Sequence, residues 1–149
     1  MKIYIDQSGK VEDTSLDTVV AYSNGDVVAI VIKASEKRKI QQFFRLAGKP
    51  KMFVYRTFAA LLFFLLEGKF RKPGKFIIDR EYWGKENTIK DQLLRIIRAN
   101  YHSNFDPEKI SFGLVGKTRD CHKQAVLVLR KKVKADKIVK SEDILKLVL

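Results

Sequence analysis

The feature that most constrains this chain is an unbroken apolar run over residues 58–66. As a helix this run is about 14 Å long at 1.5 Å per residue, which is less than half of a bilayer core. Arg56 and Glu67 bound it closely, and this further disfavours a membrane span. We therefore predict a helix over residues 51–67, ended by Gly68, that is apolar all round and buried against a sheet.

The first 33 residues are typical of three short strands. Residues 3–5, 18–23 and 27–32 are rich in the β-branched and aromatic residues that favour strands. A turn-like sequence starts at Gln7, and Asn24-Gly25 is a strong signal for a tight hairpin. We expect three antiparallel strands in this part of the chain.

Helical patterns follow. Ser35 is predicted to cap a helix that begins at Glu36, and Thr88 forms a capping-box pattern with Asp91 before another. Ser141 is expected to start a short final helix. Residues 122–132 are expected to be helical, although 125–129 fit a buried strand equally well. His102 falls in a predicted loop.

Two more strands are predicted, at residues 76–78 and 110–115, each between helical segments. Antiparallel strands followed by strand–helix alternation indicate an α/β fold. We expect a mixed sheet, with three antiparallel strands first and parallel strands after, flanked by helices. A chain of 149 residues is long enough for one core, so residues 1–149 are predicted to form a single domain.

The chain has a large positive net charge that is concentrated in two regions of the sequence. The chain has a net charge of +13. Residues 33–75 contain 12 Lys or Arg against 2 acids, and residues 117–140 contain 9 against 2, whereas the first 32 residues hold 5 acids and 2 basic residues. This favours a binding surface for a polyanion over a lysine coat that only solvates the protein, although the latter is found in thermophiles.

The chain has one cysteine, Cys121, and therefore cannot form an internal disulfide. The apolar start of the chain is broken by Asp6, which is not typical of a signal peptide. We expect a cytoplasmic protein that has no membrane partner.

Three aspartates lie where predicted strands end or a helix begins. Asp6 and Asp79 directly follow short apolar strands, and Asp120 comes after the last predicted strand. We expect the carboxylates of Asp6 and Asp79 to lie side by side, close enough to share a divalent cation bound through oxygen. Each aspartate also has a simpler structural interpretation. Asp6 and Asp79 are typical of residues in turns or at strand ends, and Asp120 is typical of a helix N-cap.

The segments Ile3-Tyr4-Ile5-Asp6-Gln7-Ser8-Gly9 and Phe76-Ile77-Ile78-Asp79 resemble the ribonuclease H-like superfamily, and the element order extends the resemblance to about residue 132. The resemblance implies Mg²⁺ or Mn²⁺ bound by Asp6 on a central strand, Asp79 beside it and Asp120 from a late helix. Residues 55–66 with 76–79 are also similar to endonuclease V-type members. The small size is similar to archaeal ribonuclease H-like exonucleases that act on single-stranded DNA.

One carboxylate of the family pattern is missing, because the apolar helix has no glutamate near its start and Thr57 stands at about that place. Glu36 on the preceding helix is the first substitute we consider as a metal ligand. Glu67 lies at the wrong end of its helix. Glu81 shares a face with Asp79 only if the strand continues beyond Asp79.

Several residues near the predicted site are suited to contact nucleic acid. Lys117 and Arg119 precede Asp120, and His122 and Lys123 follow it. His122 is also suited to move a proton or to replace a carboxylate ligand. Tyr82 and Trp83 follow Asp79 and are expected to expose rings on which a base can stack, or else Trp83 covers the edge of the core. Gly116-Lys117-Thr118 lacks the upstream glycine of a P-loop, so nucleotide hydrolysis is disfavoured.

These features lead to one main hypothesis, a metal-dependent nuclease that cleaves single-stranded nucleic acid, in the form of a DNA exonuclease. The alternative is a nucleic-acid-binding module of the same fold without catalysis, which the missing helix glutamate favours. A third possibility is a protein-interaction domain whose basic coat only maintains solubility.

Overall fold

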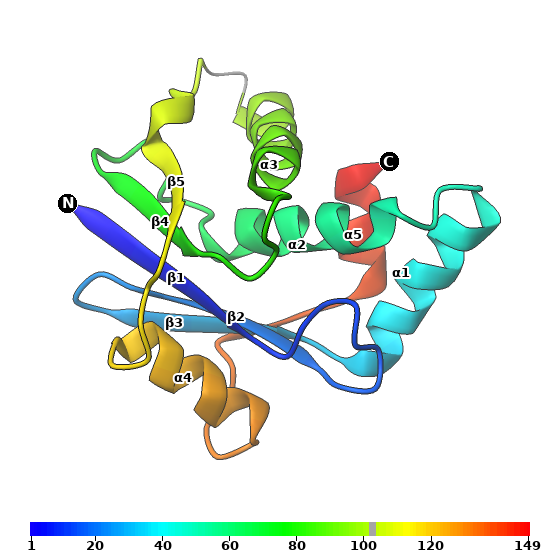
Figure 1. The fold of residues 1–149 in the computed structure, drawn as a ribbon, viewed down its shortest axis with the longest axis horizontal. Coiled ribbons are helices and arrows are strands. Elements are labelled where there is room, and N and C mark those ends of the chain that lie inside the picture. Colours follow the sequence, from blue (N-terminus) through cyan, green and yellow to red (C-terminus); the bar gives the residue numbers. More distant parts are fainter. Residues whose placement is uncertain (102–103) are drawn as a thin grey trace.

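The computed structural model describes residues 1–101 and 104–149 (Figure 1). The predicted loop at His102 therefore lies outside the described residues. Six strands form one sheet in the order β5-β4-β1-β2-β3-β6. Their bounds are β1 Lys2–Ser8, β2 Thr18–Ser23, β3 Val27–Ile32, β4 Lys75–Asp79, β5 Ile110–Gly113 and β6 Lys137–Val139. The helices are α1 Ala34–Leu46, α2 Met52–Leu65, α3 Glu86–Tyr101, α4 Asp120–Leu129 and α5 Ser141–Val148, with a 3₁₀ turn at Pro107–Lys109.

The sheet is mixed, as predicted. Strands β1, β2 and β3 pair antiparallel, whereas β4 pairs with β1, β5 with β4 and β6 with β3 in parallel. The turn between β2 and β3 uses Gly25 at φ +103°, a left-handed conformation that favours glycine. The α/β class and the three antiparallel strands are therefore confirmed, and β6 is an addition.

Helices cover both faces of the sheet. Figure 1 shows α1, α2, α3 and α5 on one face and α4 alone on the other. The prediction of a buried α2 is confirmed, because nine of its fourteen residues are buried. The β1 side chains alternate between the faces: Ile3 and Ile5 pack in the core beneath α2, whereas Tyr4 packs with the α4 cluster.

Two predicted helix starts are wrong together with their caps, and α4 begins at Asp120 rather than at His122. Helix α1 begins at Ala34, not at Glu36, and its first amide donates to Asp17 Oδ1 at 2.8 Å. Helix α3 begins at Glu86, so Thr88 lies inside it and does not form the predicted N-terminal cap. The start of α1 differs because Asp17, far along the chain, supplies the acceptor that a local Ser35 cap was expected to supply.

The segment between β1 and β2 is tied to α1 by a buried lysine. Lys37 is fully buried, and its Nζ donates to the carbonyl oxygens of Lys10 and Asp13 at 3.1 and 2.6 Å and to Thr18 Oγ1 at 3.0 Å. Burial lowers the pKa of Lys37 to about 8. These contacts hold the segment that borders the candidate site.

The apolar run of α2 belongs to the main core together with Phe76 and Ile78 of β4. Over residues 1–101 and 104–149, no helix combines the length and the apolar character needed to cross a membrane. Cys121 is a free, buried cysteine in α4.

Candidate metal site

Asp6 of β1 and Asp79 at the end of β4 lie next to each other on two neighbouring strands, and the turn predicted from Gln7 is wrong because β1 continues to Ser8. Strands β1 and β4 are parallel and pair Ile5 with Ile78, so the following residue of each strand is an aspartate. Together with Glu81 they form a group in which one carboxylate oxygen of each residue lies within 4.8 Å of the other two. The predicted proximity of Asp6 and Asp79 is confirmed, while their role as metal ligands stays a prediction.

Glu81 joins this group although β4 ends at Asp79. The Arg80 amide donates to the Gly113 carbonyl of β5 at 3.1 Å, and the Glu81 amide then donates back to the Asp79 carbonyl at 3.1 Å. This tight turn, rather than a continued strand, brings the Glu81 side chain to the aspartates. The spacing of two residues between Asp79 and Glu81 was the signal for it in the sequence.

Tyr82 anchors the segment that carries Glu81. Its ring is buried against Phe58 of α2, and its hydroxyl accepts from Gln7 Nε2 at 2.9 Å and from the Val11 amide at 3.1 Å. Gln7 is the residue after Asp6, so one phenol hydroxyl joins β1, the β1–β2 segment and the turn after β4. The prediction that Tyr82 offers an exposed ring to a base is wrong, because its ring is buried; nothing local distinguishes it from the exposed Trp83 beside it.

The carboxylates sit in an environment that disfavours their charge. Asp6 is only 4% exposed, and burial raises its pKa, with a further contribution from the nearby Asp79 carboxylate. The Gln7 amide, which donates to Asp6 Oδ1 at 2.8 Å, opposes that rise. Burial, hydrogen bonding with Asp79 and the two aspartate charges raise the pKa of Glu81 to about 7. Three close carboxylates of this kind repel one another until a cation neutralises them.

His122 is the residue of α4 that reaches Asp6. Its Nδ1 lies 2.6 Å from Asp6 Oδ2, and its side chain is 27% exposed. An ionised carboxylate can only accept, so in that state Nδ1 donates and Nε2 is left toward the surroundings. The Asp79 carboxylate is held by a backbone group: the Val115 amide, in the segment between β5 and α4, donates to its Oδ1 at 2.9 Å.

Asp120 does not join the carboxylate group. It is the exposed first residue of α4 and lines a separate groove of about 590 Å³ with Tyr4, Ser23 and Arg119. Successive residues of a helix are about 100° apart, so Asp120 points well away from the direction of His122. Among the described residues, Asp120 is not part of the group of carboxylates that lie close enough to share a cation, so its role as a metal ligand stays a prediction.

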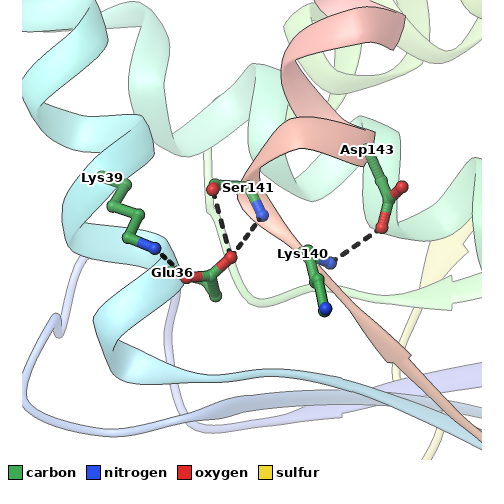
Figure 2. Close-up of polar contacts among 5 residues, drawn as sticks. All are labelled: Glu36, Lys39, Lys140, Ser141 and Asp143. Atoms are coloured by element: carbon green, nitrogen blue, oxygen red, sulfur yellow. Dashed lines mark hydrogen bonds and ion pairs between the residues drawn. The ribbon is translucent and has the colours of Figure 1, made fainter.

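Glu36 lies elsewhere and has a structural partner. Figure 2 shows its carboxylate between Lys39 and the start of α5. Its Oε1 accepts from the Ser141 amide at 3.0 Å and from Ser141 Oγ at 3.1 Å, and its Oε2 lies 2.8 Å from Lys39 Nζ. Lys39 first, and then Ser141, lower the pKa of Glu36 to about 2. Glu36 is therefore an N-terminal cap of α5, and it is not a member of the carboxylate group.

We expect Glu36→Gln to lower stability by about 1 kcal/mol, or roughly 2–4 °C in the thermal midpoint, because a charged helix cap is lost. The effect should be present at neutral pH and should shrink as the pH falls from about 4.5 toward 2, where the carboxylate itself protonates. Thermal unfolding followed by circular dichroism measures both. The metal-dependent cleavage that the sequence resemblance implies should be unchanged, and a large loss of cleavage without a loss of stability would return Glu36 to the site.

The residues predicted to contact nucleic acid lie in two segments: Trp83 follows Glu81 in the chain, and the others lie just before or within the first turn of α4. Trp83 is 65% exposed, and the Arg80 guanidinium lies 5.3 Å from its ring. Arg119 stacks over Tyr4 at 3.5 Å, and Lys117 and Lys123 are exposed. Trp83 therefore offers an exposed ring two residues after Glu81 in the chain, while contact with nucleic acid stays a prediction.

Thr57, which stands where the family pattern has a helix acid, is fully buried in α2. Its hydroxyl has no hydrogen-bond partner within residues 1–101 and 104–149.

Comparison with protein-family models, curated proteins and solved structures found no match for this chain.

Proposed function

We propose that this protein is a metal-dependent nuclease that cleaves phosphodiester bonds of single-stranded nucleic acid. The observation that carries the proposal is the convergence of Asp6, Asp79 and Glu81 within 4.8 Å, on a chain with a net charge of +13. Carboxylates bind the cation, and the basic surface attracts the phosphate backbone of the substrate.

The donor set fits Mg²⁺ or Mn²⁺. All three groups offer carboxylate oxygen, the ligand that these hard cations prefer, and no thiolate lies among them. Burial raises the pKa of Asp6 and of Glu81, so a bound cation offsets an existing electrostatic cost. When bound, such a cation supplies an activated water and stabilises the leaving oxygen of phosphodiester cleavage.

The side chains of the protein position these groups and move protons. Asp6 is held by the Gln7 amide and Asp79 by the Val115 amide, which orients one oxygen of each carboxylate. With Nδ1 of His122 donating to Asp6, Nε2 is suited to accept a proton from water or to donate one to a leaving group. We assign His122 to the role that the resemblance places on the late helix.

The topology supports a ribonuclease H-like assignment for the proposal. Strand β1 is central, antiparallel to β2 and parallel to β4, and α4 covers the face that carries Asp6. This is the arrangement that the sequence resemblance implies. Within that superfamily, the small size favours an exonuclease that acts on single-stranded DNA.

A second candidate is a nucleic-acid-binding module of this fold that does not cleave. One observation favours it: α2 has no acid in its first turn, and Glu36 is committed to the cap of α5. The carboxylate group would then be a remnant that binds cations weakly.

Cleavage of end-labelled DNA and RNA, single- and double-stranded, tests the proposal. We expect shortening of the single strands with Mn²⁺ or Mg²⁺ and none with EDTA. The pattern of products, a ladder from one end or internal fragments, separates exonuclease from endonuclease activity. Binding without cleavage of any substrate in either metal would support the binding module instead.

A further inference from the structure

A second candidate site lies at the far end of α4 from His122. It is a groove of about 570 Å³ formed by the end of α4, the segment that follows it, and strands β3 and β6. Its walls include four apolar residues, Val31, Val128, Val133 and Ile138. Ile138 is 55% exposed and Val133 is 39% exposed, so part of this apolar wall faces solvent.

Four lysines surround the same groove, namely Lys33, Lys131, Lys132 and Lys134. Only Lys33 makes an ion pair within the described part of the chain, with Asp17 at 3.7 Å. Asp136 is the one acid between residues 130 and 137, and its carboxylate accepts from the Ala29 amide of β3 at 2.8 Å. Asp17, which also lines the groove, therefore offsets the charge of Lys33, whereas Lys131, Lys132 and Lys134 have no ion-pair partner among the described residues.

The backbone at Lys131 adds an independent observation. Helix α4 ends with the Lys131 amide donating to Val128 and the Lys132 amide donating to Leu127. This ending places Lys131 at φ +60°, a left-handed position that glycine normally fills. Over residues 1–101 and 104–149, every other residue with positive φ is a glycine. A lysine at a strained position points to a use for its side chain.

We propose that this groove binds single-stranded nucleic acid, with phosphates on the lysines and a base against the apolar wall. Single strands suit such a surface because their bases are free to pack on apolar side chains while the backbone follows the positive charge. Along α4, Leu129 lies about 10 Å from His122, so a bound strand can extend toward the carboxylates. The inference rests on the proposed substrate class but not on the metal site.

The test measures binding of a fluorescein-labelled oligo-dT strand by anisotropy in EDTA, over a series of salt concentrations. The variant combines Lys131→Gly, Lys132→Ala and Lys134→Ala. Its matched control combines Arg95→Ala, Arg98→Ala and Lys146→Ala, which remove the same charge from exposed positions of α3 and α5, outside the two basic regions of the sequence. We expect the groove variant to lose at least about twentyfold in affinity and about 2 from the salt slope, and the control to lose little.

Lys131→Gly alone provides a second test, in which a loss of affinity cannot be explained by a loss of stability. We expect its thermal midpoint to stay the same or rise, because glycine relieves the left-handed strain, while affinity falls by roughly threefold to tenfold. Equal losses in the groove variant and the control would overturn the inference, as would unchanged affinity in both groove variants. Because EDTA prevents metal-dependent cleavage, this result is independent of whether the protein is a nuclease.

Discussion

Asp6→Asn is expected to lower metal-dependent cleavage of single-stranded DNA by a factor of about 1000 or more, equivalent to about 4 kcal/mol of transition-state stabilisation. The substitution keeps the size of the side chain and removes the charge that a cation needs. Asp6 is the most buried of the three carboxylates and the one that contacts His122, so its loss affects both metal binding and proton transfer. Initial rates with Mn²⁺ at fixed substrate concentration measure the effect.

Binding provides the control within the same protein. Affinity for an oligonucleotide in EDTA should be unchanged or slightly higher in Asp6→Asn, because a negative charge near the phosphates is gone. Asp91→Asn makes the same charge change at an exposed residue of α3 and should cleave like the wild type. If Asp6→Asn cleaves at the wild-type rate with the same metal requirement, Asp6 has only a structural role in β1 and the proposed site is wrong.

The parts of the fold that were predictable are those decided by local sequence. The β2–β3 hairpin follows from Asn24-Gly25 between two β-rich runs, and the burial of α2 follows from an apolar surface that has no polar face. Strand β6 was missed because its three residues, two of them exposed, have no pattern apart from the β3 strand that they pair with.

Contacts between distant segments explain the other differences. Asp17 caps α1 from the segment after β1, and Glu36 caps α5 from 105 residues away. Neither partner can be found by examining the residues near a helix start. The same holds for α4, where residues 125–129 fitted a strand or a helix equally well and packing on β1, β2 and β3 stabilises the helix.

In the candidate site, too, some residues could be predicted from local sequence and others depend on contacts between distant segments. Asp6 and Asp79 were predictable because each follows a short apolar run and these two runs pair as parallel neighbours, although β1 continues past Asp6 to Ser8. The choice of Asp120 over His122 depended on where α4 begins and on which way each side chain points, and boundaries are the least certain part of sequence analysis. Glu81 depended on a turn held by Gly113 and Tyr82.

Glu81→Gln tests the repulsion within the carboxylate group by its pH dependence. In the folded, metal-free protein the pKa of Glu81 is raised to about 7 from its ordinary value of 4.5. Between these values the folded state holds a proton that the unfolded state has released, so the contribution of Glu81 to stability falls as the pH rises through this range. Above about pH 7 the full cost of the charged group is present, about 1–2 kcal/mol after solvent screening.

Glutamine is neutral throughout, so the variant escapes this cost. In EDTA we expect its thermal midpoint to exceed that of the wild type by roughly 3–6 °C at pH 8 and by much less at pH 5. Added Mn²⁺ should raise the wild-type midpoint at pH 8 and the variant's midpoint less, and cleavage by the variant should fall by about 100-fold because one ligand is lost. Glu67→Gln removes the same charge from an exposed residue that follows α2 and should show neither effect. A midpoint difference that is the same at pH 5 and pH 8 would mean that Glu81 does not share the electrostatic environment of Asp6 and Asp79.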